Sequence, residues 1–225
     1  MNGVDSFESR DRLARFITPL FFLVSFFVFA FVFLRMPLLN DSDSYYHLAV
    51  ARLYAHNGVF AAIPWARFSL LAAGGDKELL FHLVLIPFVT LVDPAVGGRL
   101  ALALLNASVA TILAWRATKS LGLPGLLVPA LLWLAAPPFV MRAVRLRPEW
   151  LALLLILIAV TWSFKNRPRA LGALSLLFAL SYTAFHVFVA LCVMWLGYEW
   201  WVDVVRRGPD GTQRKFSIFN FQFSI

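Results

Sequence analysis

The stretch 16-FITPLFFLVSFFVFAFVFL-34 is an apolar run of about nineteen residues, long enough to cross the hydrocarbon core of a bilayer as an α-helix. Arg10, Arg12 and Arg15 precede it, as basic residues precede the core of a signal peptide. The run is too long for such a core, however, and no small-x-small cleavage site closes it. It therefore predicts an uncleaved membrane anchor.

The composition of the whole chain agrees with a membrane protein. Of 225 residues, 61% are hydrophobic and only 14% are charged, and the mean hydropathy is +0.78. A water-soluble domain has no room to bury that many apolar side chains. The net charge of +8 comes from short basic clusters that lie between apolar runs. This spacing argues against a nucleic-acid-binding surface.

Further apolar runs predict an all-α, polytopic membrane protein with about six transmembrane helices. The segment after the first span is too polar to cross as a whole, and its short run 79-LLFHLVLIPFVTLV-92, which contains Pro87, predicts an interfacial helix. The predicted segments are a cytoplasmic N-terminus at 1–15, spans at 16–34, 99–115, 121–141 and 150–164, two short spans within 170–202, external loops at 35–98 and 142–149, and a cytoplasmic tail at 203–225.

The distribution of lysine and arginine predicts the orientation. With the N-terminus in the cytoplasm, most basic clusters fall inside, including Arg116 with Lys119 and Arg206 with Arg207. The segment 142-RAVRLRPE-149 is an exception, because it carries three arginines on the predicted outer side. Positive charge held there is typical of a site for an anionic ligand.

The segment 41-DSDSYYHL-48 opens the first external loop with two aspartates at the start of a helical pattern that Gly58 closes. One interpretation is that Ser42 or Asp43 caps this helix, because a side-chain oxygen accepts hydrogen bonds from its free N–H groups. A cap needs only one such residue. The second interpretation is a site for a divalent cation such as Mg²⁺ or Mn²⁺, and the third is a general base.

Two interpretations apply to the arginine-rich loop as well. Pro148 and Glu149 are typical of a helix start, and single arginines near a span often reach toward lipid headgroups. Three arginines beside a glutamate favour a phosphate or pyrophosphate site instead. The four histidines, in contrast, show no recognised metal-ligand spacing, and His82 and His186 are expected to be structural hydrogen-bonding groups.

These motifs together resemble the N-terminal part of the C-type (GT-C) membrane glycosyltransferases. The segment 43-DSYYHL-48 is similar to the acidic-aromatic motif in the first external loop of oligosaccharyltransferase catalytic subunits. The segment 145-RLRPE-149 resembles their second external loop, and the related protein O-mannosyltransferases share the topology. The resemblance covers roughly residues 12 to 202. Proteins of these families usually have more spans than this chain. The resemblance therefore implies that the chain is a fragment, a truncated product or one module of a split enzyme.

The resemblance implies transfer of a sugar from a polyprenyl-phosphate carrier to an acceptor at the non-cytoplasmic face of the membrane. The implied partners are the lipid-linked donor, membrane lipids, and other subunits or a C-terminal part, but no nucleic acid. The implied site consists of Asp43 as the catalytic residue; Asp43, Glu149 and Asp41 as ligands of Mg²⁺ or Mn²⁺; Arg142, Arg145 and Arg147 as ligands of the donor phosphate; and Tyr45, Tyr46, His47 and His82 as candidate acceptor or donor contacts.

Two other classes of protein remain as alternatives. The short length is compatible with a non-catalytic assembly subunit of a membrane complex. A transporter module is the other alternative, with the acidic loop as a cation gate. Against the transporter, no predicted span carries an acidic residue near its centre, where coupling ions usually bind.

Overall fold

A computed structural model describes residues 3–37, 39, 41–65, 75–163 and 168–206, and these parts of the chain are helical without any β-strand. The predicted all-α class is therefore confirmed for them. Residues 207–225, which belong to the predicted cytoplasmic tail and include Arg207 of the predicted basic cluster, lie outside the described residues. The elements are α1 (Gly3–Leu34), α2 (Ser42–Asn57), α3 (Leu79–Leu91), α4 (Pro94–Leu121), the 3₁₀ turn η2 (Leu123–Leu126), α5 (Leu127–Ala135), α6 (Pro137–Ala143), α7 (Glu149–Ser163), α8 (Pro168–Ser181) and α9 (Phe185–Arg206).

Three helices among the described residues are long and apolar enough to cross a membrane. They are Ala14–Leu34 within α1, Pro94–Leu121, which is α4, and Phe185–Val202 within α9. The first and the last coincide with predicted spans, whereas α4 extends the predicted second span by several residues at each end. The chain is thus a membrane protein by the length and composition of these helices.

The other predicted spans differ in shape from a straight crossing. The predicted third span is two helical parts, Leu123–Ala135 and Pro137–Ala143, bent by 93°. The bend follows Ala136, at the proline pair, because proline lacks the N–H that would continue the helix and its ring clashes with the preceding turn. Helices α7 and α8 have 15 and 14 residues, so each is about 22 Å long against a hydrocarbon core of about 30 Å. The expected total of six spans therefore stays a prediction.

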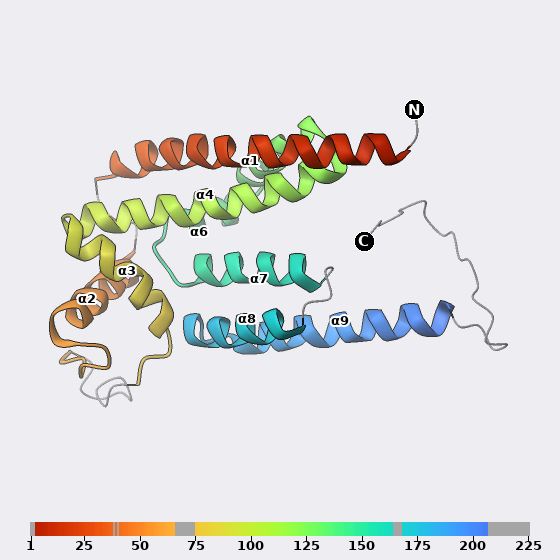
Figure 1. The fold of residues 1–225 in the computed structure, drawn as a ribbon. Coiled ribbons are helices and arrows are strands. Elements are labelled where there is room, and N and C mark those ends of the chain that lie inside the picture. Colours follow the sequence, from red (N-terminus) through yellow and green to blue (C-terminus); the bar gives the residue numbers. More distant parts are fainter. Residues whose placement is uncertain (1–2, 38, 40, 66–74, 164–167, 207–225) are drawn as a thin grey trace.

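Helix α4 lies at the centre of the arrangement, where it contacts α1, α3 and α7 (Figure 1). Its buried residues are mostly small, which lets neighbouring helices approach closely. Helix α7 lies between α4 and α8, α9 lies beside α8, and α2 and α3 close one end of the molecule (Figure 1). The small buried residues of α4 are Gly97, Gly98, Ala101, Ala103, Ala107, Ala110 and Ala114.

Two glycines determine how α2 and α3 sit at this end. Gly58 ends α2 as predicted, since its φ of +89° is a conformation that side chains rarely adopt, and its N–H donates to the Tyr54 carbonyl at 3.0 Å. Gly97 on α4 touches the backbone of α3, because a Cβ atom there would come within 1.9 Å of the Phe88 carbonyl oxygen. The position of α3 on α4 thus depends on direct backbone contact.

The fold predicts which exposed positions share one side of the membrane. Asn57 ends α2, Thr183 belongs to the connection between α8 and α9, and Leu121 ends α4. The connection between α8 and α9 lies at the end of the molecule that contains α2 and α3, and the C-terminal end of α4 lies at the opposite end (Figure 1). In a Cys192→Ser background, single cysteines at Asn57 and Thr183 should react with an impermeant thiol reagent from the same side of sealed vesicles. A cysteine at Leu121 should react only from the other side. Joint labelling of Asn57→Cys and Leu121→Cys from one side would contradict this arrangement.

Candidate functional site

Asp41 starts helix α2. Its backbone is extended (φ −159°, ψ 137°), and its Oδ1 accepts a hydrogen bond from the Asp43 N–H at 3.3 Å. A carboxylate in this position satisfies one of the free N–H groups of the first turn. The expectation that Ser42 or Asp43 caps the helix is therefore wrong, and Asp43 does not serve as the cap.

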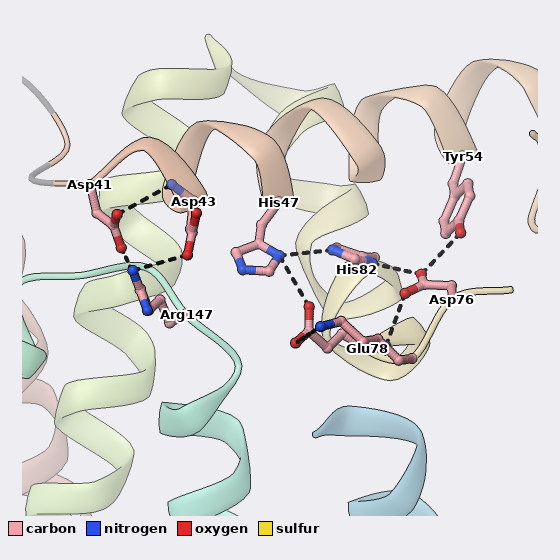
Figure 2. Close-up of polar contacts among 9 residues, drawn as sticks. Asp41, Asp43, His47, Tyr54, Asp76, Glu78, His82 and Arg147 are labelled. Carbon is pink, nitrogen blue, oxygen red and sulfur yellow. Dashed lines mark hydrogen bonds and ion pairs between the residues drawn. The ribbon is translucent and has the colours of Figure 1, made fainter. Parts of the chain in front are cut away.

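Arg147 holds both aspartates from a distant part of the chain (Figure 2). Its Nε donates to Asp41 Oδ2, and its Nη2 lies 2.9 Å from Asp43 Oδ2. Next to this bridge, the Leu146 N–H donates to Ser44 Oγ at 3.0 Å. The two segments that were predicted as external loops are thus in direct contact.

The two carboxylates that pair with Arg147 differ in their exposure to solvent. The Asp41 side chain is 10% exposed, and the hydrogen bond from Arg147 holds its pKa below the ordinary range despite partial desolvation. The same hydrogen bond raises the pKa of Arg147. The Asp43 side chain is 55% exposed. One of its oxygens faces Arg147, and the carboxylate remains accessible to a molecule that approaches from outside.

The predicted cation ligands are arranged around arginines. Glu149 does not join the two aspartates; its Oε1 lies 3.8 Å from Arg142 Nη1, and Arg147 lies between Asp41 and Asp43 (Figure 2). Guanidinium groups in these positions do not fit a cation that Asp41, Asp43 and Glu149 hold together. Binding of Mg²⁺ or Mn²⁺ at these residues stays a prediction.

The arginine-rich segment surrounds a pocket of about 80 Å³. Arg142, Arg145 and Arg147 contribute the positive charge, and Trp150 belongs to the apolar part of the lining. The indole N–H of Trp150 donates to the Arg142 carbonyl at 3.0 Å. The Trp133 ring stacks on this indole and the Phe139 ring meets it edge-on, so that both contacts help to fix its position. The complete lining is Phe139, Arg142, Arg145, Arg147, Glu149, Trp150 and Leu153.

A second polar cluster lies between α2 and α3 (Figure 2). His82 Nδ1 lies 2.6 Å from Asp76 Oδ2, and because a carboxylate only accepts, this nitrogen donates. His82 Nε2 lies 2.9 Å from His47 Nδ1. Asp76 also accepts from the Tyr54 hydroxyl and from the Glu78 N–H, both at 2.9 Å. The cluster therefore joins two helices through a chain of hydrogen bonds.

Burial has opposite effects on the acids and bases of this cluster. Desolvation, with the neighbouring His82 and Arg147, lowers the pKa of His47 to about 3, so its imidazole is neutral. Desolvation also raises the pKa of Glu78. Burial alone would raise the pKa of Asp76, but its hydrogen bonds, first of all the one from His82, keep it below the ordinary value.

The remaining predicted contacts divide between the two clusters. The Tyr45 hydroxyl accepts from the Leu39 N–H at 3.1 Å, and the Tyr45 side chain is exposed. The Tyr46 ring packs edge-on against His47 and His82. The sequence patterns single out both histidines as candidate contacts, but they do not single out Asp76 or Glu78. The available signal was the spacing in 76-DKELLFH-82, which places Glu78 one helical turn before His82.

No protein-family model, curated protein or solved structure matches this chain.

The two-carboxylate bridge predicts that Arg147 stabilises the fold. Arg147→Gln leaves the shielded Asp41 carboxylate without its charged partner, so we expect a loss of about 1–2 kcal/mol in unfolding free energy. Arg145→Gln is the matched control, with an expected change of less than about 0.5 kcal/mol. Thermal unfolding of the purified variants in the same detergent measures both. Equal melting temperatures for the two variants would contradict a structural role of the bridge.

Proposed function

We propose that this chain is a multi-pass membrane glycosyltransferase with a cytoplasmic N-terminus. It would transfer a sugar from a polyprenyl-phosphate-linked donor to an acceptor on the non-cytoplasmic side. The single observation that carries the proposal is the contact of Asp43, the residue of the acidic-aromatic motif, with Arg147 of the arginine-lined pocket. An accessible carboxylate thus lies beside a pocket suited to an anion. Glycosyl transfer from a phosphate carrier requires both a general base and a site that stabilises the leaving phosphate.

The pocket lining supports a phosphate carried by a lipid. Arginine binds phosphate oxygens in a bidentate manner, and three guanidinium groups in one pocket oppose the charge of a leaving phosphate. Phe139, Trp150 and Leu153 provide an apolar surface in the same pocket. A polyprenyl phosphate has this combination of a charged head and an apolar chain.

The chemical step then assigns a role to each group. The acceptor oxygen forms a bond to the anomeric carbon of the sugar, and its proton passes to the Asp43 carboxylate. The bond between that carbon and the carrier oxygen breaks, and its electron pair leaves with the phosphate. Arg142 and Arg145 stabilise the charge on the departing phosphate. Arg147 orients Asp43 and belongs to the pocket as well.

Replacing Asp43 tests the catalytic role directly. Since Asp41 caps α2, Asp43→Asn keeps the helix start and should leave folding and membrane insertion intact. Loss of a general base should reduce transfer by at least about 100-fold. The measurement is transfer of radiolabelled mannose and glucose from synthetic polyprenyl-phosphate donors in vesicles, with and without Mn²⁺.

The matched control for this experiment is Asp93→Asn. Asp93 is also an exposed aspartate at a helix start, where it accepts from the N–H groups of Ala95 and Val96 at 3.0 and 3.2 Å. It should retain wild-type transfer, because asparagine caps about as well as aspartate. Wild-type transfer by Asp43→Asn would instead favour the non-catalytic assembly subunit.

The phosphate pocket makes a separate prediction about donor binding. Arg145→Gln should weaken binding of a photo-crosslinkable polyprenyl phosphate by at least about tenfold, since a hydrogen bond to a charged group contributes about 1.5–3 kcal/mol. Arg145→Lys should recover only part of the binding, because an ammonium group lacks the planar fork. Arg52→Gln, at an exposed arginine of α2 outside this pocket, is the control. Equal labelling of wild type by the phosphate and by the uncharged polyprenol would exclude a phosphate site.

A further inference from the structure

We propose that the buried side chains of His47, Glu78 and His82 bind one divalent transition-metal ion of the zinc class. Among the described residues, these three form the group in which at least three histidine, cysteine or acidic ligand atoms lie within 4.8 Å of one another. His47 belongs to α2, His82 to α3, and Glu78 immediately precedes α3. The site differs from the aspartates at Arg147, and the proposal does not depend on glycosyl transfer.

The distances within the cluster are close to those of a tetrahedral site. With metal–ligand distances of about 2.0–2.1 Å, neighbouring ligand atoms in a tetrahedron lie about 3.3–3.4 Å apart. His47 Nδ1 lies 2.9 Å from His82 Nε2 and 3.8 Å from Glu78 Oε2. These separations lie on either side of the tetrahedral value. Shifts of about half an ångström, within the reach of side-chain rotation, would convert one arrangement into the other.

The donor set determines the class of metal. Two imidazole nitrogens and one carboxylate oxygen suit Zn²⁺ and its neighbours in the first transition row, whereas Mg²⁺ and Ca²⁺ prefer oxygen alone. Three protein ligands leave a fourth tetrahedral position for a water or another small ligand. The donor set of this cluster therefore differs from the all-carboxylate set of Asp41, Asp43 and Glu149.

Asp76 orients His82 as the partner of a metal-binding histidine does. Histidine ligands commonly donate their second ring N–H to a carboxylate, which fixes the tautomer and the ring direction. Asp76 Oδ2 accepts a hydrogen bond from His82 Nδ1 at 2.6 Å. Hydrogen bonds from the Tyr54 hydroxyl and the Glu78 N–H hold Asp76 in place in turn. As a result, His82 Nε2 carries the lone pair of the ring and faces His47 (Figure 2).

A hydrogen-bonded chain without a metal accounts for the histidines but not for Glu78. In such a chain His47 donates to His82, and His82 donates to Asp76. The Glu78 side chain is only 10% exposed, and its Oε2 lies 3.8 Å from His47 Nδ1. Among the described residues, Lys77 is the lysine that pairs with Glu78; its Nζ lies 4.0 Å from Glu78 Oε1, on a side chain that is 59% exposed. A buried carboxylate beside two imidazoles is explained better by a bound cation.

The experiment uses the full chain, purified without an affinity tag, stripped with a chelator and dialysed. Zn²⁺ alone is then added and counted by elemental analysis after gel filtration, and Co²⁺ is added as a spectroscopic probe. We expect one Zn²⁺ per chain and the visible absorption of tetrahedral Co²⁺. Glu78→Gln and His82→Gln should each lose the bound metal and the absorption. Asp76→Asn should bind about 10–100-fold more weakly, as expected for the partner of a histidine ligand.

The controls separate metal binding from folding. His56→Gln and His186→Gln replace exposed histidines outside the cluster and should bind like wild type. Glu78→Gln keeps the size of the side chain, so circular dichroism and gel filtration should show a folded protein. A folded wild-type chain that takes up no Zn²⁺, or retention of the Co²⁺ absorption in both Glu78→Gln and His82→Gln, would overturn the proposal. Neither result would affect the role proposed for Asp43, which the sugar-transfer assay tests by itself.

Discussion

The bridge between Arg147 and the two aspartates is the interaction on which the candidate site depends. Asp41 and Asp43 lie two residues apart, and their like charges oppose each other until one guanidinium group pairs with both. The two sides of the bridge are 106 residues apart in sequence. Together with the hydrogen bond from Leu146 to Ser44, the bridge joins the start of α2 to the connection between α6 and α7. Without it, the accessible carboxylate and the arginine-lined pocket would have no fixed relation.

The apolar helices supply the frame for this site. In the most apolar stretch of α4, 61% of the residues are buried inside the protein, so this helix packs against its neighbours along much of its length. In the corresponding stretches of α1 and α9, only 11% and 6% of the residues are buried. Apolar surface of this extent requires lipid or another protein to cover it. The polar clusters lie at the end of this frame rather than within it, where α2 and α3 cover the helix ends (Figure 1).

The helical class and the main interruptions were accessible from the sequence, because they depend on local rules. Apolar runs mark α1, α4 and α9, Gly58 ends α2, and the proline pair Pro137 and Pro138 coincides with the bend. The identity of the cap was not accessible in the same way. Ser42, Asp43 and Asp41 are all suitable residues, and the choice depends on which backbone leaves the helical conformation.

The cluster of His47 and His82 shows a second limit of local reasoning. Each histidine lies in an unremarkable helical segment, and no local spacing links residues that are 35 positions apart. Their proximity follows from the packing of α2 against α3, which tertiary contacts determine. The Arg147 bridge was partly accessible, because the positive charge in the second loop predicted an anionic partner. That this partner includes the aspartates of the first loop required the fold.

Gly97 of α4 lies against the backbone of α3, where only a hydrogen atom fits in place of a side chain. Alanine, the smallest replacement, would place a methyl group 1.9 Å from the Phe88 carbonyl oxygen, and backbone atoms cannot yield as a flexible side chain can. Relief would require α3, the helix that carries His82, to shift against α4. The packing of α3 on α4 therefore restricts residue 97 to glycine, although this residue has no polar group of its own.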